Sequence, residues 1–486
     1  MFNSSFYFIA AYIFVLPIIG LVARAYSKET SLKDYYLAGG AVGLLPLVFT
    51  LYATQYSGNT LLGFAGNAYR NGAIALFSVL GMMMVVVVWT LFARKLQKLS
   101  KEQGFITIID YLRYRFNLPM LANLANIILI ITLCNYVLTN FKAIGLLVES
   151  ITNGGVPLVW GVFIAAIAMA FYESVGGMRS VIFTDMLQGS LLLAGCLLVF
   201  TVILVIFDGP FNLISQLQNV PAGHWQTMDA SRWRQGLSIV FLFGFAISLY
   251  PHAIQRIYAA RDWLSLKKSF IFMFFLPLFT TLPIVITAMA SFLLLPDIPR
   301  EQSDQIIPHV LNELATNFPA MKYLLALFMA AAIAAIMSTI DSALLSIGSA
   351  ITNDICKPLM PNSSQAQLTR IGKYLSWVLM LLMAWLATLL PQTIWGLLVL
   401  KLEILVQVAP AIILGIRTTH IRGQSILLGL IAGTTAAIWF KLGFWGTPEL
   451  YNISAGLWGL GINLCTIALA QTLGIGQQKT QAQRQA

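Results

Sequence analysis

Long apolar stretches recur along this chain, and they restrict its fold more than any other feature. A helix of about 20 residues crosses the ~30 Å of hydrocarbon in a bilayer, where the backbone must satisfy its own hydrogen bonds. Hydrophobic residues make up 58% of the 486 residues and charged residues 10%, whereas soluble proteins average roughly 45–50% and 25%. The sequence therefore predicts an all-α integral membrane protein. Thirteen spans are expected, near 6–24, 42–69, 73–94, 121–149, 157–173, 181–207, 235–258, 270–295, 320–351, 369–390, 394–416, 424–441 and 449–473.

The distribution of Lys and Arg indicates the orientation of the spans, because these residues are retained on the cytoplasmic side. With the N-terminus outside, 21 of the 29, Arg256 included, fall in inner connections or the C-terminal tail, and six fall in outer connections. The first span lacks the basic region and cleavage site of a signal peptide, so we expect it to be retained. We expect an outside N-terminus and a cytoplasmic C-terminus. The net charge of +11 then requires no nucleic-acid partner.

The aqueous segments between the spans are short. The longest, 208–234 and 296–319, cannot form a soluble catalytic or sensory domain. The four histidines lie on separate loops or span ends, and no nucleophile–base pair or metal-ligand spacing is visible. We therefore do not expect an enzyme, and we look for function among the polar residues inside the spans.

The second span contains a polar segment at mid-depth, residues 50–60. Gln55, Ser57, Gly58 and Asn59 stand together there. This composition favours local unwinding, which frees backbone carbonyls for a cation. Close helix packing through small residues is the alternative interpretation.

The ninth span places hydroxyl groups beside a carboxylate. Ser338, Asp341 and Ser342 share one helix face at spacings of three and four, and Ala335 and Thr339 flank that face. Such oxygens are the ligands of hard cations. Alternatively, the hydroxyls bond carbonyls of their own helix. That alternative does not account for Asp341, because a carboxylate inside a membrane requires a partner.

A third polar position is Asp185, about one turn into the membrane in the sixth span. It is either a cation ligand or the counter-charge of Arg179 or of another inner basic residue.

Four motifs, in order and on the expected spans, resemble the sodium:solute symporter family, which includes bacterial proline and pantothenate symporters and sodium–glucose cotransporters. The similarity covers about residues 30–420. The motifs are Asp34-Tyr35-Tyr36-Leu37-Ala38-Gly39-Gly40, Gly176-Gly177 through Thr184-Asp185 with Gln188, Pro251-His252 with Arg256, and Met337-Ser338-Thr339-Ile340-Asp341-Ser342 with Thr352-Asn353-Asp354.

The resemblance implies an inverted-repeat fold of the leucine-transporter type. Spans 2–6 and 7–11 would form the two five-helix repeats, and the solute would lie between broken spans 2 and 7 at mid-membrane. The expected units are a peripheral N-terminal span (1–30), the first repeat (40–207), the second repeat (235–416), two peripheral C-terminal spans (424–473) and a disordered cytoplasmic tail (474–486).

The resemblance also implies a sodium site. Carried over by position, the main site falls on the backbone carbonyls of Ala53, Tyr56 and Ala335 and on the side-chain oxygens of Ser338 and Thr339. These residues agree with the two polar segments described above.

Some members of the family bind a second sodium. Its ligands would fall here on Ser338, Asp341, Ser342 and Asp185. Relatives with this site can have serine where this chain has Asp341. The more acidic position either strengthens the site or makes it sensitive to protons.

Substrate contacts in relatives would fall on Gln55, Asn59, Thr60, Phe243 and Ile247. Proline-type symporters have an aspartate in place of Gln55 and a polar aromatic in place of Ile247, and sugar-type members have a glutamine in place of Thr60. These departures argue against either substrate. Phe243 either forms an apolar wall beneath the ligand or is simple packing.

Two further charges, Lys401 and Glu403, lie in the eleventh span, which lines the cavity in relatives. Being two residues apart, they point in different directions. One of them can face the substrate, and we include Glu403 among the candidate substrate residues. Alternatively, Lys401 lies near the outer surface and extends its charge to the headgroups.

The sequence therefore predicts a secondary active symporter that uses Na⁺ as coupling ion to import a small polar or anionic organic solute by alternating access. A proton-coupled carrier is the first alternative, since Asp341, Asp185 or Glu403 can hold a proton. The second is a transporter-like nutrient sensor acting through a partner protein. The pattern specifies neither the solute, nor the number of sodium ions, nor the oligomeric state.

Overall fold

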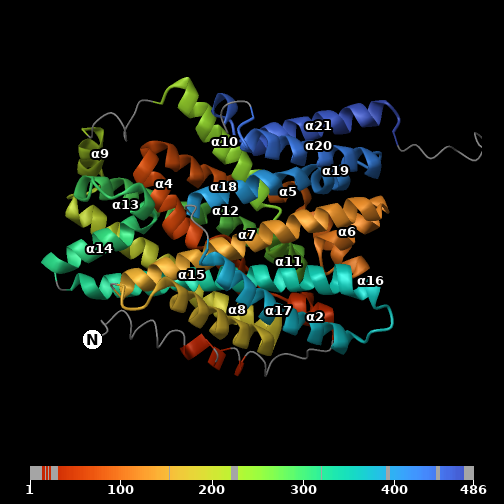
Figure 1. Cartoon of the computed structure of the whole chain (residues 1–486), viewed down its shortest axis with the longest axis horizontal. Coiled ribbons are helices and arrows are strands. Elements are labelled where there is room, and N and C mark those ends of the chain that lie inside the picture. Colours follow the sequence, from red (N-terminus) through yellow and green to blue (C-terminus); the bar gives the residue numbers. More distant parts are fainter. Residues whose placement is uncertain are drawn as a thin grey trace, which may run out of the picture.

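The chain folds into a bundle of helices, most of which run along the long axis of the molecule (Figure 1). The computed structural model describes residues 31–152, 154–219, 228–318, 320–389, 394–444 and 449–475, with seven further residues between 14 and 22. Most of the expected first span and of the expected tail lie outside the described residues. Within them the secondary structure is helical, apart from one isolated backbone bridge between Val42 and Ala260.

The first half of the bundle contains two short helices, then a broken span, then three long helices. Its elements are α2 (Leu32–Leu37), η1 (Ala38–Gly40), α3 (Leu44–Gln55), η2 (Asn59–Gly63), α4 (Phe64–Asn71), η3 (Gly72–Leu76), α5 (Phe77–Gln103), α6 (Ile108–Phe116), α7 (Pro119–Ile151) and α8 (Leu158–Ile206).

The second half also contains a broken span. Its elements are α9 (Pro210–Gln218), α10 (Ala230–Ile247), α11 (Pro251–Ala259), α12 (Trp263–Phe279), α13 (Thr281–Leu294), η4 (Arg300–Gln305), α14 (Ile306–Asn317), α15 (Met321–Ser349), η5 (Ala350–Cys356), α16 (Lys357–Leu359), α17 (Gln365–Ala387), α18 (Ile394–Leu405), η6 (Val406–Val408), α19 (Ala409–Arg417), α20 (Gly423–Lys441), η7 (Leu450–Asn452) and α21 (Ala455–Thr472).

The membrane-crossing segments coincide with the predicted spans from the second onward. Within the described residues, nine helical stretches are long and apolar enough to cross a bilayer, and the bent pair α10–α11 makes a tenth. The helix α3 and the first part of α8, up to Ser174, are shorter apolar helices. The number is three below thirteen because α4 and α5 form one stretch, Asn59–Gln103, which covers parts of the second and third spans, and because the helix of the expected fifth span, Leu158–Ser174, is too short to count. The first span lies mostly outside the described residues.

Two spans are broken, as predicted. The second is interrupted between α3 and η2, and the seventh bends by 54° between α10 and α11. Pro251 is the first residue of α11, a position that suits proline because its missing N–H has no intrahelical acceptor there. A third interruption, inside α8, occurs at Gly177, whose φ of 54° is left-handed. An added Cβ there would meet the Tyr35 ring at 2.6 Å, so this position requires glycine.

The helix α15 forms the centre of the bundle. It packs against α3, α7, α8 and α11, and its residues from 328 to 349 are all buried. A helix that is apolar on every side is typical of such a position, and its few hydroxyl and carboxyl groups therefore lie in the protein interior.

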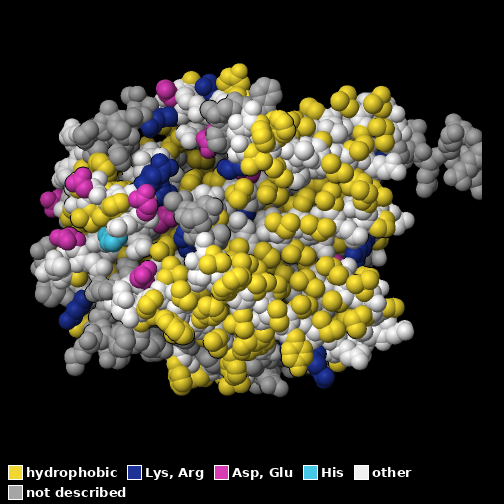
Figure 2. All heavy atoms as spheres, viewed as in Figure 1, with side chains coloured by type: hydrophobic (Ala, Val, Ile, Leu, Met, Phe, Trp, Pro, Cys, Tyr) yellow, Lys and Arg dark blue, Asp and Glu magenta, His cyan; other side chains and the backbone are white. Residues whose placement is uncertain are grey.

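The surface is divided between apolar and charged regions. Short helices α9 and α14 lie toward one end of the molecule, and α6 and α16 lie toward the other (Figure 1). On the face shown in Figure 2, hydrophobic side chains cover most of the long-helix surface, and charged side chains gather toward the α9–α14 end. A continuous exposed apolar surface of this kind is suited to contact with lipid.

Candidate functional site

The break in the second span leaves backbone carbonyls without the donors of a continuous helix. The N–H of Ser57 donates to the Thr60 hydroxyl at 3.4 Å, that of Gly58 to the Asn140 side chain at 3.2 Å, and that of Asn59 to the Ser57 hydroxyl at 3.2 Å. In a regular helix these three N–H groups would bond the carbonyls of residues 53–55. Those oxygens are therefore available to other partners.

The helix α7 holds the broken segment in place. Asn140 accepts the Gly58 N–H through Oδ1, while its own Nδ2 donates to the Tyr136 carbonyl at 2.8 Å. One turn earlier on α7, the Tyr136 hydroxyl interacts with the side chains of Ser57 and Thr339. Sequence reasoning missed both α7 residues, because nothing in the local pattern of α7 indicates which backbone groups they contact.

Four of the five residues of the expected main sodium site meet at this break. The Ser338 hydroxyl lies 2.9 Å from the carbonyl oxygens of both Ala53 and Ala335. The Thr339 hydroxyl lies 3.4 Å and 3.0 Å from the same two oxygens. Tyr56, the fifth, follows the last residue of α3 in an extended conformation. All four contacting atoms are hydroxyl or carbonyl oxygens, which suit a hard cation.

A second polar cluster, buried beside the first, contains the residues of the expected second sodium site. Asp185 accepts a hydrogen bond from Thr50 at 2.5 Å, and the Ser342 hydroxyl lies 3.0 Å from that of Thr54. Asp341 accepts a hydrogen bond from the Tyr172 hydroxyl. Asp185, Asp341 and Ser342 each show no exposed surface.

Arg256 enters this second cluster, which corrects its expected place in an inner connection. It is fully buried on α11. Its Nη2 donates to the Ser342 hydroxyl at 2.6 Å and lies 3.6 Å from Asp185 Oδ2. Arg179, the other candidate partner of Asp185, instead pairs with Asp34 at 2.6 Å. The counter-charge of Asp185 is thus Arg256, which contacts two of the four expected second-site residues.

The expected substrate residues of the second span are buried and polar. Gln55 and Asn59 are each at most 5% exposed, and neither side-chain amide has a hydrogen-bond partner among the described residues. The Thr60 hydroxyl, in contrast, accepts the Ser57 N–H. A buried amide without partners is costly, so these two side chains are suited to bonding a polar ligand.

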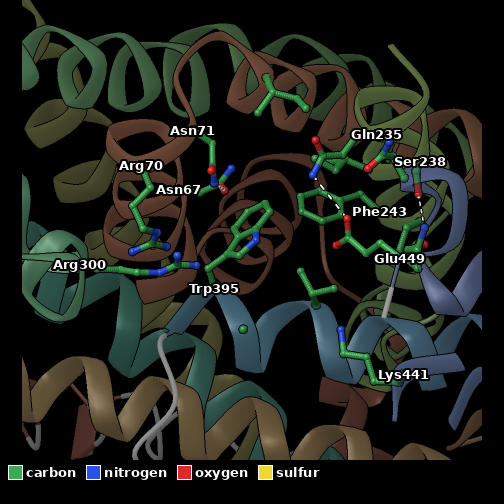
Figure 3. A pocket seen from close by; sticks show the side chains of 17 residues that line it. Asn67, Arg70, Asn71, Gln235, Ser238, Phe243, Arg300, Trp395, Lys441 and Glu449 are labelled. Carbon is green, nitrogen blue, oxygen red and sulfur yellow. Dashed lines mark hydrogen bonds between the residues drawn. The ribbon is translucent and has the colours of Figure 1, made fainter. Parts of the chain in front are cut away.

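Phe243 forms part of an aromatic floor beneath a cavity at the α9–α14 end. Its ring lies 5.7 Å from that of Phe64 and 6.0 Å from that of Trp395. Above these rings the cavity has a volume of about 350 Å³, and Figure 3 shows Arg70 and Arg300 near Trp395 on one side of it. We call this cavity the vestibule. It is lined by Asn67, Arg70, Asn71, Ile74, Gln235, Ser238, Ile239, Leu242, Phe243, Arg300, Trp395, Gly396, Val399, Lys441, Glu449, Asn452 and Ser454.

Ile247, the last residue of α10, is 4% exposed. It is the residue at which the seventh span breaks, and the N–H of Tyr250 bonds its carbonyl at 3.2 Å. The structure thus places Ile247 at one break and Gln55 at the other.

Glu403 and Lys401 point in different directions, as expected, but Glu403 does not join the break. Its carboxylate pairs with Lys441 of α20 at 2.9 Å, and a Cβ added at Gly456 of α21 would meet its Cα at 2.6 Å. Glu403 therefore packs against the two C-terminal helices. Lys401 is the inward residue: it is 1% exposed, and its Nζ lies 3.4 Å from the centre of the Tyr136 ring.

Two broken spans packed around a buried central helix, with oxygen atoms converging at one break, are features of the leucine-transporter fold, which is a fold of multi-pass membrane proteins. The solved structure of a Na⁺-coupled sialic acid symporter in a substrate-bound outward-open state has this fold. It matches with a TM-score of 0.79 at 19% identity, over 96% of this chain and 98% of that chain.

Sequence comparisons point to the same class. The sodium/pantothenate symporter of Escherichia coli is 25% identical over 78% of this chain and 78% of its own length. The sodium/glucose cotransporter of Vibrio parahaemolyticus is 26% identical over 75% of this chain and 71% of its own length. The model of the sodium:solute symporter family matches residues 35–433. The chain belongs to the sodium:solute symporter family, so it is a multi-pass membrane protein whose family and fold are those of sodium-coupled transporters.

Proposed function

We propose that this protein is a sodium-coupled symporter that imports a small polar or anionic organic solute by alternating access. The observation that carries the proposal is the convergence of the Ser338 and Thr339 hydroxyls on the carbonyls of Ala53 and Ala335. We assign the main sodium site to these four residues and Tyr56.

Coupling follows from the position of this site on the break. Sodium bound between α3 and α15 would order the segment that carries Gln55 and Asn59, and this ordering would improve the solute site. By linkage, the solute must then raise the affinity for sodium by the same factor. A membrane potential of 100 mV adds ~2.3 kcal/mol for each sodium charge carried inward.

We propose that the vestibule opens to the outside and that the membrane is a bacterial inner membrane, with an outside N-terminus and a cytoplasmic C-terminus. The excess of Lys and Arg in the expected inner connections supports this orientation. Phe243, Phe64 and Trp395 would then separate the outer solution from Gln55 and Asn59. Residues 40–207 and 235–416 would be the two repeats that move relative to one another, with α20 and α21 at their periphery.

We assign a single sodium ion to the coupling step. Two of the second-site residues, Ser342 and Asp185, already contact Arg256, so a sodium ion at Ser338, Asp341, Ser342 and Asp185 requires the guanidinium to leave. Sodium titration should accordingly give a Hill coefficient near 1.

Proton coupling is the second candidate, and one observation favours it. Asp341 Oδ1 and Glu173 Oε2 are buried, and neither has a hydrogen-bond partner among the described residues. Protonation removes the cost of burying such a carboxylate. Uptake that is driven by a pH gradient and does not depend on sodium would favour this candidate. Solute binding that depends on pH and not on sodium would favour it as well.

The sodium assignment is tested by thermal melting of the purified protein in NaCl and in choline chloride. A ligand that binds only the folded state stabilises it by about 2.7 kcal/mol at 100 times its dissociation constant, so sodium should raise the melting temperature. Ser338→Ala should raise the sodium concentration at half-effect at least about tenfold, because it removes a ligand from the site.

Ser190→Ala is the matched control. Ser190 is exposed on α8 and its hydroxyl bonds the Met186 carbonyl at 2.8 Å, one turn back on the same helix. This variant should respond to sodium as the unchanged protein does. An equal response of Ser338→Ala and Ser190→Ala would contradict the sodium assignment.

A further inference from the structure

Lys401 carries a buried amine group inside the bundle. It lies on α18, one turn after Leu398 and two after Ile394, on the side of α18 that packs against α7 and η2. Its Nζ lies 3.4 Å from the Tyr136 ring centre and 5.6 Å from that of Tyr250. The sequence left open whether this lysine reaches the surface, and its burial shows that it does not.

The charge of Lys401 has no anionic partner in the described part of the chain. Its Nζ makes no hydrogen bond and no ion pair there. The two aromatic rings attract a cation, but they carry no charge. A buried charge without an opposite charge destabilises a protein strongly, and the cost is high inside a membrane. An anion beside Lys401 would remove that cost.

The surroundings of Lys401 are those of a ligand site. The Tyr136 ring beneath it carries the hydroxyl that interacts with Ser57 at the break and with Thr339 of the sodium site. The unbonded amides of Gln55 and Asn59 belong to the same broken segment. A purely structural lysine would not need such neighbours.

The vestibule and Lys401 lie on different faces of α18, because Val399 of the vestibule lining is two residues from Lys401. Trp395 and Val399 line the vestibule and stand on the same helix, and six residues of helix place Lys401 about 9 Å beyond Trp395. Of the lining cations, Arg70 pairs with Asp304 and Lys441 with Glu403, which leaves Arg300 alongside the lining carboxylate of Glu449 (Figure 3).

We propose that Lys401 binds a carboxylate group of the transported solute, which makes that solute an organic anion. The inference rests on the proposed function and narrows its substrate class. The carboxylate would pair with the ammonium group over Tyr136, and Gln55 and Asn59 would bond the remaining polar groups. Sodium nearby would favour the same negative charge, so the two ligands would assist one another.

The test uses pairs of solutes that differ in the carboxylate: lactate and lactamide, succinate and succinamide, pantothenate and panthenol. Each is added to the purified full-length protein in sodium and in choline, and the melting temperature is measured. At least one acid should raise the melting temperature in sodium, and its neutral counterpart should not. Lys401→Met, which keeps the length of the side chain, should weaken binding of that acid by about 30-fold or more.

Lys322→Met is the matched control, because Lys322 also lies over a tyrosine ring, 5.1 Å from the Tyr323 centre, but is exposed. It should bind the acid normally. The solute-free Lys401→Met protein should melt no lower than the unchanged protein, since it has lost a buried charge. A lower melting temperature would mark Lys401 as a structural contact and would overturn the proposal.

Three other outcomes would also overturn it. These are equal binding of a neutral counterpart, undiminished binding by Lys401→Met, and no shift with any acid. A shift with chloride alone, measured against gluconate, would identify an inorganic anion as the partner instead. The sodium assignment is judged separately from the carboxylate site. Stabilisation by sodium without any effect of an acid would contradict the carboxylate site and agree with the proposed symporter. Binding of an acid that does not depend on sodium would contradict the coupling and agree with the carboxylate site.

Discussion

Gly58 lies in the break of the second span, where the structure leaves no room for a side chain. A Cβ at this position would lie 2.7 Å from Ile336 Cγ1 and 2.9 Å from Ala143 Cβ. These contacts belong to α15 and α7, two helices of the packed core. In Gly58→Ala the added methyl group must therefore push the broken segment away from both helices.

The size of the effect follows from this geometry. Forcing an extra methyl group into a packed core costs about 1–3 kcal/mol. The displaced segment follows Tyr56 directly, so the cost should fall on the arrangement in which the Ala53 carbonyl meets the Ser338 hydroxyl. If the whole packing cost of about 1–3 kcal/mol is lost from sodium binding, the affinity for sodium falls about 5- to 150-fold.

The assay is the sodium dependence of the melting temperature. Gly461→Ala is the control, because nothing lies within 4 Å of a Cβ at this position in α21. Alanine favours a helix over glycine by about 1 kcal/mol, so this variant should be as stable as the unchanged protein or more so, with the same sodium midpoint. A Gly58→Ala protein with an unchanged sodium midpoint would refute the link between the break and sodium binding, even if it melted lower.

Three other perturbations have distinct expected results. Arg256→Met leaves Asp185 buried without its counter-charge and should cost about 3–5 kcal/mol of stability. Adding Asp185→Asn in a double variant should restore much of that stability, measured as the melting temperature. A double variant that melts no higher than Arg256→Met would contradict the pairing. Glu403→Gln should lower the melting temperature by breaking the contact with Lys441 and leave the sodium midpoint unchanged; a shifted midpoint would return Glu403 to the site. Asp262, in the aqueous turn before α12, has a pKa of about 2 instead of 3.8 because of backbone and side-chain hydrogen bonds. Its stabilising contribution is present above pH 3.8 and is lost as the pH falls through 2, so Asp262→Asn should flatten the fall in melting temperature over that range.

The features that the sequence predicted well are set by local physics. A run of about 20 apolar residues must cross the bilayer as a helix, so the spans from the second onward were predictable. The polar residues at 55–59 weaken a helix wherever they stand, and the structure has the break there. Helical spacing grouped Ser338 with Asp341 and Ser342, flanked by Ala335 and Thr339, whichever helix packs against them, whereas the choice of Ala335, Ser338 and Thr339 as sodium ligands came from the family resemblance and stays a prediction.

The features that the sequence did not predict depend on contacts between distant segments. Arg256 was assigned to a loop because the charge rule counts every arginine near the end of a span, and its partner Asp185 is 71 residues away. The spacing of Lys401 and Glu403 shows that they diverge but not which one turns inward. That choice depends on where α7, α20 and α21 pack around α18.

The backbone bridge at Val42 joins the two broken spans. Val42 donates its N–H to the Ala259 carbonyl and accepts the Arg261 N–H, both at 2.9 Å. These bonds fasten the segment before α3 to the far end of α11, so each broken span has one half tied to a half of the other. The amide protons of Val42 and Arg261 are protected from exchange while these two hydrogen bonds are formed. Their rate of exchange with deuterium would therefore report how often the two broken spans separate at that end.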